Sequence, residues 1–268
     1  LIKPFFSTDE LGRYFGKKEN KEWIIYTTSE VRKEINNYPN IKNHLERFKK
    51  VITSDFRPYG LHRSRDERFF VGEKIMSLRK CHRPTFTYTD FDCYVSQTYF
   101  VIKTERVNLK YLTALLNSKL VAFWLKYKGK LQGNLYQVDK VPLLDIPIAM
   151  TDKQYIFETL VDYILFVHLP REQQLIKYID NDLIIHSIEE VIDHAIFELY
   201  FPNDLESAGL KILEHLKDIK PLKENEKAET VIRFYHWLNE QQNPIRNTLL
   251  KANILSKDLL AIINSRIS

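Results

Sequence analysis

The sequence predicts an α+β protein: a mixed, mostly antiparallel irregular sheet with helices, followed by an all-helical C-terminal region. Three observations predict this fold class. Short segments rich in β-branched and aromatic residues occur in the first 150 residues, long amphipathic helical patterns fill the remainder, and prolines separate those patterns. With 268 residues and 44% hydrophobic content, the chain can bury a substantial core. We expect two domains, at residues 1–150 and 151–268.

The first domain begins with a strand–helix pattern. Residues 23–27 are β-branched and aromatic, and Ser29 can cap the helix that follows. Apolar residues then recur at helical spacing, and Pro39 separates two helices or opens the second. Four further strands and one helix are expected in this half, at residues 69–71, 74–77, 85–89 and 94–102, and at 109–127.

The helix predicted at 109–127 has a second potential N-cap at Ser118, where we expect it to break. Asn117, Ser118 and Lys119 are interpreted as a helix junction that fixes the fold rather than as a catalytic group. Glycines and prolines after residue 128 predict an extended, loop-rich stretch.

The second domain consists of long amphipathic helical patterns. These patterns predict helices at residues 152–168, 171–200, 204–218 and 227–262, the last interrupted at Pro244.

Charge divides the chain at about the same position. Residues 1–150 contain 27 Lys and Arg against 16 Asp and Glu, a net charge of +11, whereas residues 151–268 have a net charge of −6. Such a partition indicates one half that meets a polyanion, for which nucleic acid is the natural candidate, and another half with a different role.

Catalytic and export signals are not found in the sequence. It contains no phosphate-binding loop, no zinc-protease or nucleophile-elbow motif, and none of the Asn-Pro-Pro-Tyr type that holds a flipped adenine. Cys81 and Cys93 are too few for a zinc site and are expected as reduced thiols. No apolar run reaches the roughly 20 residues needed to span a bilayer. We expect a cytoplasmic protein with no membrane partner.

Candidate DNA contacts gather in two basic segments. Arginine forks pair with guanine edges or phosphates, and lysine serves phosphate as a point charge. The first segment, residues 57–83, contributes Arg57, Tyr59, His62, Arg63, Arg65, Arg68, Arg79, Lys80 and Arg83. The second contributes Lys126, Lys128, Lys130, Gln132, Asn134 and Tyr136. A solvated charged loop and a lysine-rich helix C-terminus are the structural alternatives for these segments.

Other polar and aromatic residues are assigned to the core or to turns. His168 and His194 lie on apolar helical faces and are expected to be packed. Five aromatics at strand spacing are expected to be mostly core, namely Tyr88, Phe91, Tyr94, Tyr99 and Phe100. Asp55 with Glu67, or Asp90 with Asp92, are the only acidic pairs considered for a nuclease metal site, and we interpret them as turn formers.

Several motifs, in order, resemble the TaqI-like C-terminal specificity domain. Residues 1–14 (LIKPFFSTDELGRY) are similar to its entry sequence, and 111–120 (YLTALLNSKL), 133–136 (GNLY) and 141–148 (VPLLDIPI) to its closing part. The resemblance covers about residues 1–150. Residues 151–200 are similar to the helical tail of combined restriction and modification enzymes, through 192–200 (IDHAIFELY).

The resemblance implies a target-recognition domain of a Type II restriction-modification adenine-N6 methyltransferase. Such a domain reads double-stranded DNA, while an upstream methyltransferase domain of the same chain binds S-adenosylmethionine and does the chemistry. The chain begins with Leu1 rather than Met, and we expect it to be cut from that longer protein, with no catalytic residue, cofactor or metal of its own. Two alternatives remain: a protein-interaction scaffold with a basic face, and a metal-dependent nuclease whose carboxylates are not recognised.

Overall fold

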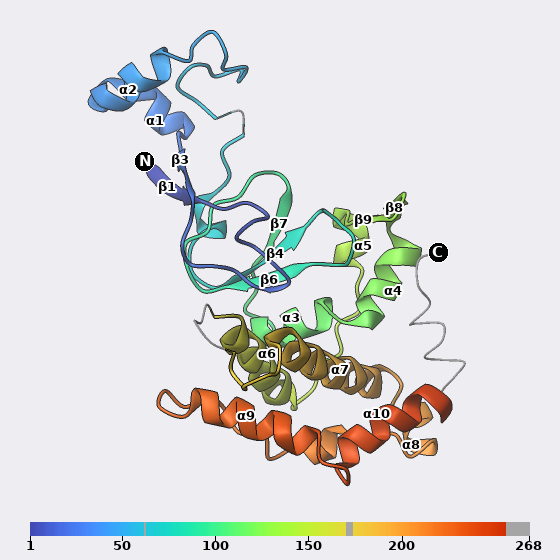
Figure 1. Cartoon of the computed structure of the whole chain (residues 1–268). Coiled ribbons are helices and arrows are strands. Elements are labelled where there is room, and N and C mark those ends of the chain that lie inside the picture. Colours follow the sequence, from blue (N-terminus) through green and yellow to red (C-terminus); the bar gives the residue numbers. More distant parts are fainter. Residues whose placement is uncertain (62, 170–173, 256–268) are drawn as a thin grey trace.

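The computed structural model describes residues 1–61, 63–169 and 174–255, and Figure 1 shows the arrangement of its elements. Its strands are β1 (Ile2–Phe5), β2 (Tyr14–Phe15), β3 (Glu22–Ile25), β4 (Lys74–Leu78), β5 (Lys80–Cys81), β6 (Phe86–Thr89), β7 (Tyr99–Ile102), β8 (Lys130–Gln132) and β9 (Leu135–Gln137). The α-helices are α1 (Ser29–Lys33), α2 (Pro39–Glu46), α3 (Leu109–Leu116), α4 (Lys119–Lys128), α5 (Lys140–Leu144), α6 (Gln154–His168), α7 (Asn181–Tyr200), α8 (Pro202–Ser207), α9 (Lys227–Leu238) and α10 (Pro244–Leu255). Short 3₁₀ helices are η1 (Ile35–Asn37), η2 (Glu67–Phe69) and η3 (Leu213–Leu216).

The strands form three small sheets that are antiparallel apart from one pairing. β1 pairs with β3, the central sheet has the order β2-β6-β4-β7, and a third sheet has the order β5-β9-β8. Only the short β2 runs parallel to its neighbour β6. The predicted α+β class with a mostly antiparallel, irregular sheet is therefore confirmed.

Helices are stacked in layers on one side of the central sheet. In Figure 1, α3 lies directly below the sheet, α6 and α7 lie below α3, and α9 with α10 form the outermost layer. α7 contacts α3, α4, α6 and α10, and twelve of its twenty residues are buried. A helix buried on several faces needs apolar residues around most of its circumference, and the sequence of α7 supplies them.

One hydrophobic core runs from the sheet into these helices without interruption. Ile75 and Phe86 of the sheet, Leu115 of α3, Leu160 of α6 and Ile192 of α7 are all fully buried in one cluster. Each such side chain contributes about 1.5 to 3 kcal/mol when it is removed from water. The core thus crosses residue 150 and joins the basic half to the acidic half.

The predicted break near Ser118 is present and has a capping role. Ser118 precedes α4, and its hydroxyl accepts a hydrogen bond from the Val121 amide at 3.2 Å. The Asn117 side chain binds both the amide and the carbonyl of Phe86, at 3.1 and 2.7 Å, and so attaches the end of α3 to β6. The junction interpretation of these residues is confirmed.

Some predicted elements differ from the structure. Residues 69–71 are not a strand, because the carboxylate of Asp66 accepts from the Arg68 amide and starts η2 instead. Of the strand predicted at 94–102, residues 99–102 form β7, and Tyr94 makes an isolated parallel bridge to Phe5 of β1. α7 begins at Asn181 rather than 171, after its N-cap Asp180. The helix predicted at 204–218 is replaced by the shorter α8, which ends at Ser207. Gly209 has a φ of +64°, which is incompatible with a right-handed helix.

Candidate nucleic-acid interface

Four of the candidate contacts lie on an arm that projects from the sheet. The arm comprises residues 28–65, carries α1 and α2, and extends to the upper left in Figure 1; His62 lies outside the described residues. Arg57, Arg63 and Arg65 are exposed there, and no carboxylate among the described residues pairs with them. Tyr59 is half-buried and donates its hydroxyl proton to the Glu46 carboxylate, which closes the arm on itself.

The arm is fixed to the sheet at its base. The buried Tyr26 hydroxyl donates to the Arg65 carbonyl and accepts from the Arg65 amide, both at 2.6 Å. The Leu61 amide donates to the Thr27 carbonyl at 3.4 Å. These bonds hold the backbone of Arg65 in place while its side chain stays exposed, which is the rigid support that contact with a duplex requires.

The second group lies on the hairpin formed by β8 and β9 and on the end of α4. Gly133 has a φ of +61° and Asn134 a negative one, as in the two-residue turns that place glycine first. Gln132 and Asn134 are exposed at the tip. Lys126 and Lys128 occupy the last turn of α4, where they also favour the helix dipole.

Not every candidate in this second group is available to a ligand. Tyr136 is 8% exposed and packs in the main core between β5 and β8, so we withdraw it as a contact. Lys130 is exposed, and its ammonium lies 3.9 Å from the Asp139 carboxylate. Lys80 of β5 pairs with Gln137 of β9, so its exposed side chain belongs to the same small sheet as the hairpin.

Arg79 and Arg68 are engaged by their own neighbourhoods. The Arg79 guanidinium lies over the Phe100 ring at 4.8 Å and donates to the Gln97 carbonyl at 3.2 Å. Arg68 is exposed, and the Asp66 carboxylate holds its guanidinium at 2.5 Å. Such a surface pair is weak and can open for a better anion.

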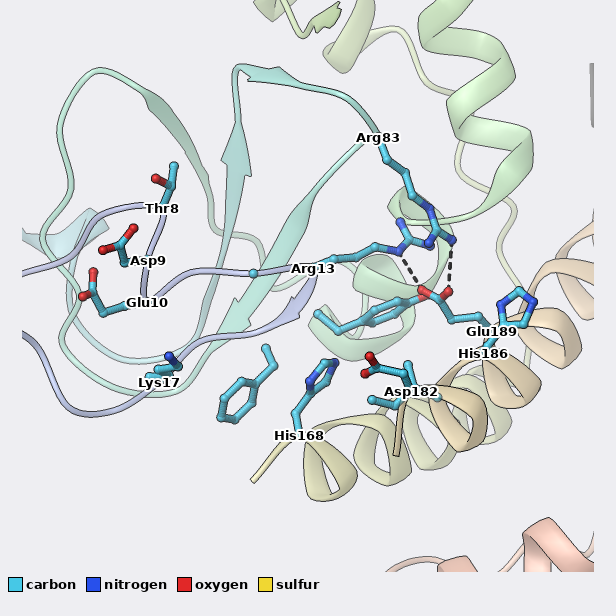
Figure 2. Close-up of a pocket in the computed structure, with 14 residues that line it drawn as sticks. Thr8, Asp9, Glu10, Arg13, Lys17, Arg83, His168, Asp182, His186 and Glu189 are labelled. Atoms are coloured by element: carbon cyan, nitrogen blue, oxygen red, sulfur yellow. Dashed lines mark hydrogen bonds and ion pairs between the residues drawn. The ribbon is translucent and has the colours of Figure 1, made fainter. Parts of the chain in front are cut away.

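Arg83 directs its guanidinium toward the helical half, and about half of its side chain remains exposed. Figure 2 shows its guanidinium and that of Arg13 converging on the Glu189 carboxylate of α7, at 3.0 and 2.6 Å. Burial alone would raise the pKa of Glu189, but the two guanidinium groups hold it below its usual value. The three residues line a hollow of about 450 Å³ between the halves. We therefore interpret Arg83 as a residue of the junction, while its role as a DNA contact stays a prediction.

The Arg13 site was not predicted from the sequence. Besides Glu189, the Arg13 guanidinium donates to the Pro84 carbonyl and to both the side-chain and backbone oxygens of Asn117. One signal was present: Glu189 is an acidic residue within the apolar stripe of a predicted helix, next to Ile185, Ile188 and Ile192. A buried carboxylate of that kind requires a cationic partner.

Further ion pairs join the two halves along the same boundary. Lys110 of α3 pairs with Asp162 of α6 at 2.7 Å, and Lys119 of α4 with Asp193 of α7 at 3.6 Å. In each case the cation comes from the basic half and the carboxylate from the acidic half. Part of the opposite charge of the two halves is therefore neutralised internally.

The tyrosines and histidines that the sequence assigns to packed positions are packed in the structure, and the burial of Lys74 was not predicted. Tyr88, Tyr94 and Tyr99 are buried, His194 hydrogen-bonds the Leu210 carbonyl at 2.7 Å, and His168 stacks on Phe15. Lys74 is fully buried and donates to the Gly72 and Phe91 carbonyls, and burial lowers its pKa to about 8.

The acidic pairs considered for a nuclease have other partners. Glu67 accepts from Lys3 and from the Tyr94 hydroxyl, and Asp90 pairs with Lys18 at 3.2 Å. Within residues 1–61, 63–169 and 174–255, no three His, Cys, Asp or Glu side chains lie together as metal ligands would. The described helices include none with the length and apolar character of a membrane span.

Comparisons with known proteins agree with the sequence resemblance. Residues 21–148 match the TaqI-like C-terminal specificity domain family. Over 101 residues the chain is 34% identical to the Type II methyltransferase M.HincII of Haemophilus influenzae and to M.HindII of the Rd strain of that species. These alignments cover 37% of this chain but only 20% and 19% of the two relatives, so the chain spans about a fifth of their length.

The fold is similar to that of a solved restriction-modification enzyme. The structure of the Type IIL enzyme MmeI in complex with DNA matches 88% of this chain and 30% of that chain, with a TM-score of 0.53 at 13% identity. At this identity the likeness is one of fold. Because it covers 88% of the chain, it includes part of the helical half as well as the sheet.

Proposed function

We propose that the chain recognises a short sequence in double-stranded DNA, because residues 21–148 match the TaqI-like C-terminal specificity domain family. It would do so for a restriction-modification methyltransferase. The family match is the observation that carries this proposal. The relatives named as Type II methyltransferases support the kind of enzyme it serves.

The distribution of free cations supports DNA as the ligand. The arm carries exposed arginines and the hairpin exposed Lys, Gln and Asn, and in Figure 1 both lie above the layers of α6, α7, α9 and α10. Phosphate contacts fix a protein on the duplex, and contacts to base edges specify the sequence. Gln132 and Asn134 at the hairpin tip have the paired donors and acceptors that base edges require.

The helical half has a supporting role in this proposal. Its net charge is −6, so its surface repels the phosphates of DNA. Its buried carboxylates form ion pairs with Arg13, Arg83 and Lys119 of the recognition half. We assign it to bracing the recognition half and to contacts with other protein domains.

Chemistry is assigned to a part of the protein upstream of this chain. We propose that a methyltransferase domain of the same polypeptide binds S-adenosylmethionine, flips the target adenine and methylates its N6 atom. The chain delivers the duplex to that domain and has no catalytic residue of its own. The whole system would act in the cytoplasm, where the DNA is.

Selection from a library of randomised duplexes tests the proposal. The chain is expected to enrich one short motif and to bind it with an affinity that falls steeply with salt. Lys128→Ala is expected to lower the salt dependence by about one phosphate contact. Lys223→Ala, which changes an exposed lysine of the acidic half, is the matched control and should leave binding unchanged.

The alternatives give different outcomes in the same experiment. A protein-interaction scaffold would bind all duplexes weakly and equally, with no enriched motif. A metal-dependent nuclease would cleave the library when Mg²⁺ is added. Binding without enrichment would refute sequence recognition by this chain.

A further inference from the structure

Among the residues that the structure describes, three arginines and no carboxylate line a hollow at the base of the arm. Its volume is about 350 Å³, and its charged lining consists of Arg32, Arg63 and Arg65. The polar remainder is hydroxyl-bearing, from Thr27, Thr28, Ser29 and Ser64. We call this hollow the arginine pocket. Arg32 belongs to α1 and was not among the residues predicted to bind DNA.

The walls of the pocket are held in place before any ligand arrives. The Arg32 guanidinium stacks on the Phe56 ring at 4.2 Å, which fixes its plane. The loop carrying Phe56 is closed by the Ser54 hydroxyl, which donates to the Gly60 carbonyl at 2.7 Å. A Cβ on Gly60 would lie 2.6 Å from the Phe56 Cβ, so the loop can close this tightly only with glycine.

The opposite wall is fixed by the hydrogen bonds of the Tyr26 hydroxyl to the Arg65 backbone. In contrast to Arg13, Arg68 and Arg83, the three pocket arginines have no ion pair to any carboxylate of the described chain. Their guanidinium groups therefore remain available to a ligand.

This chemistry selects a phosphoryl group over the edge of a base. Guanidinium groups are donors only, and three of them in one hollow concentrate positive charge that a neutral base cannot balance. A phosphate offers several acceptor oxygens with negative charge and pairs with arginine forks. The serine and threonine hydroxyls can donate to the same oxygens. A guanine edge also offers acceptors to one arginine fork, but it carries no net charge to balance three guanidinium groups.

We propose that the arginine pocket binds one backbone phosphate of the duplex and so sets the position of the arm on the DNA. This inference rests on the proposed function and makes it specific: Arg63 and Arg65 act with Arg32 on a single phosphate and do not read bases. The hairpin then remains for sequence readout.

Salt dependence of duplex binding distinguishes one shared phosphate from three separate ones. Each phosphate neutralised contributes about 0.9 to the slope of log affinity against log salt. If the three arginines share one phosphate, the triple variant Arg32→Gln, Arg63→Gln, Arg65→Gln should lose about 0.9 in slope, and no single variant should lose more than that. Separate phosphates would cost the triple variant about 2.7, which would overturn the proposal.

The motif enriched from randomised duplexes gives a second readout. It should be the same for the wild type and for Arg63→Gln, while affinity falls on the order of tenfold, as expected for a lost charge-assisted hydrogen bond. A relaxed or altered motif would overturn the proposal, because it would show that Arg63 reads a base. Arg233→Gln is the matched control: Arg233 is an exposed arginine of α9 in the acidic half, is paired with Glu229, and should change neither slope nor motif.

Two further measurements separate a failure of the pocket from misfolding of a variant and from a failure of the proposed function. Arg32→Lys keeps the charge without the fork and should preserve the slope, and the unfolding midpoint of every variant is compared with the wild type. Inorganic phosphate, titrated by NMR, should shift the amide signals of Ser29 and Ser64 in the wild type but not in the triple variant. Phosphate binding without any duplex binding would refute the DNA assignment, and no phosphate binding would refute the pocket itself.

Discussion

Replacing Glu189 with glutamine is expected to destabilise the protein by about 3 kcal/mol. The Glu189 carboxylate is 6% exposed and accepts from Arg13 and Arg83. Removing one partner of a buried ion pair costs about 3 to 5 kcal/mol because it leaves an uncompensated charge. Glutamine keeps one acceptor oxygen, so we expect the lower end of this range. Its amide NH₂ group is a donor, however, and cannot accept from the second guanidinium group.

Chemical and thermal unfolding followed by circular dichroism measure this effect. At about 2 °C per kcal/mol for a chain of this size, the melting temperature should fall by roughly 6 °C. Glu190→Gln is the matched control on the same helix, because Glu190 is exposed and pairs with the exposed His186, and it should stay within about 0.5 kcal/mol of the wild type. Equal stability of the two variants would refute the assigned role of Glu189.

The pH dependence of the same pair gives an independent check. The pKa of Glu189 is lowered in the folded protein from an ordinary value of 4.5. A lowered carboxyl pKa contributes stability that is complete above the ordinary value and is lost as pH falls through the folded value. The difference between wild type and Glu189→Gln should therefore be constant near neutral pH and shrink only below about pH 4.5. A difference that shrinks between pH 6 and 8 would contradict the ionised state of Glu189.

Three further predictions concern other sites. Asn117→Ala leaves the buried amide and carbonyl of Phe86 without partners and should cost about 2 to 3 kcal/mol by denaturant unfolding, and an unchanged midpoint would show that the contact is dispensable. Gly133→Ala places a side chain at a φ of +61° with no atom within 4 Å, so backbone strain of about 1 kcal/mol should speed hydrogen exchange in the hairpin about fivefold; unaltered exchange would count against that turn. Burial raises the pKa of Cys81 to about 11 and of Cys93 to about 12, so iodoacetamide at pH 8 should label neither thiol until the protein is denatured, and fast native labelling would contradict their burial.

Long periodic elements were predictable from the sequence, and short ones were not. α6 and the α3–α4 pair were located to within about two residues, because apolar residues at helical spacing repeat over several turns. β2 and β5 contain two residues each, and two residues carry no period. The β8–β9 hairpin was assigned only to an extended region, although Gly133-Asn134 was available as a turn signal.

Residue type indicated which half is basic but not which cations are free. Arg65 and Arg83 are alike in sequence, yet Arg83 is held by a carboxylate 106 residues further along the chain. Arg13 and Glu189 are 176 residues apart, and no local pattern relates them. Ionic pairing across such distances depends on the packing of α7 against the sheet, which only the folded structure specifies. Whether the remaining candidates touch DNA stays a prediction.

The uninterrupted core has a consequence for exchanging target preference between proteins of this architecture. A chimera joined at residue 150 would take Tyr111 and Phe157, whose rings lie 5.2 Å apart, from different parents. It would likewise separate Arg13 from its native partner Glu189 on α7. Transplants confined to the arm or the hairpin leave those contacts whole, since both protrude into solvent and are anchored at few points. Target preference is therefore best changed by substitutions in the arm or the hairpin, while the sheet and the helices beneath it are kept together from one protein.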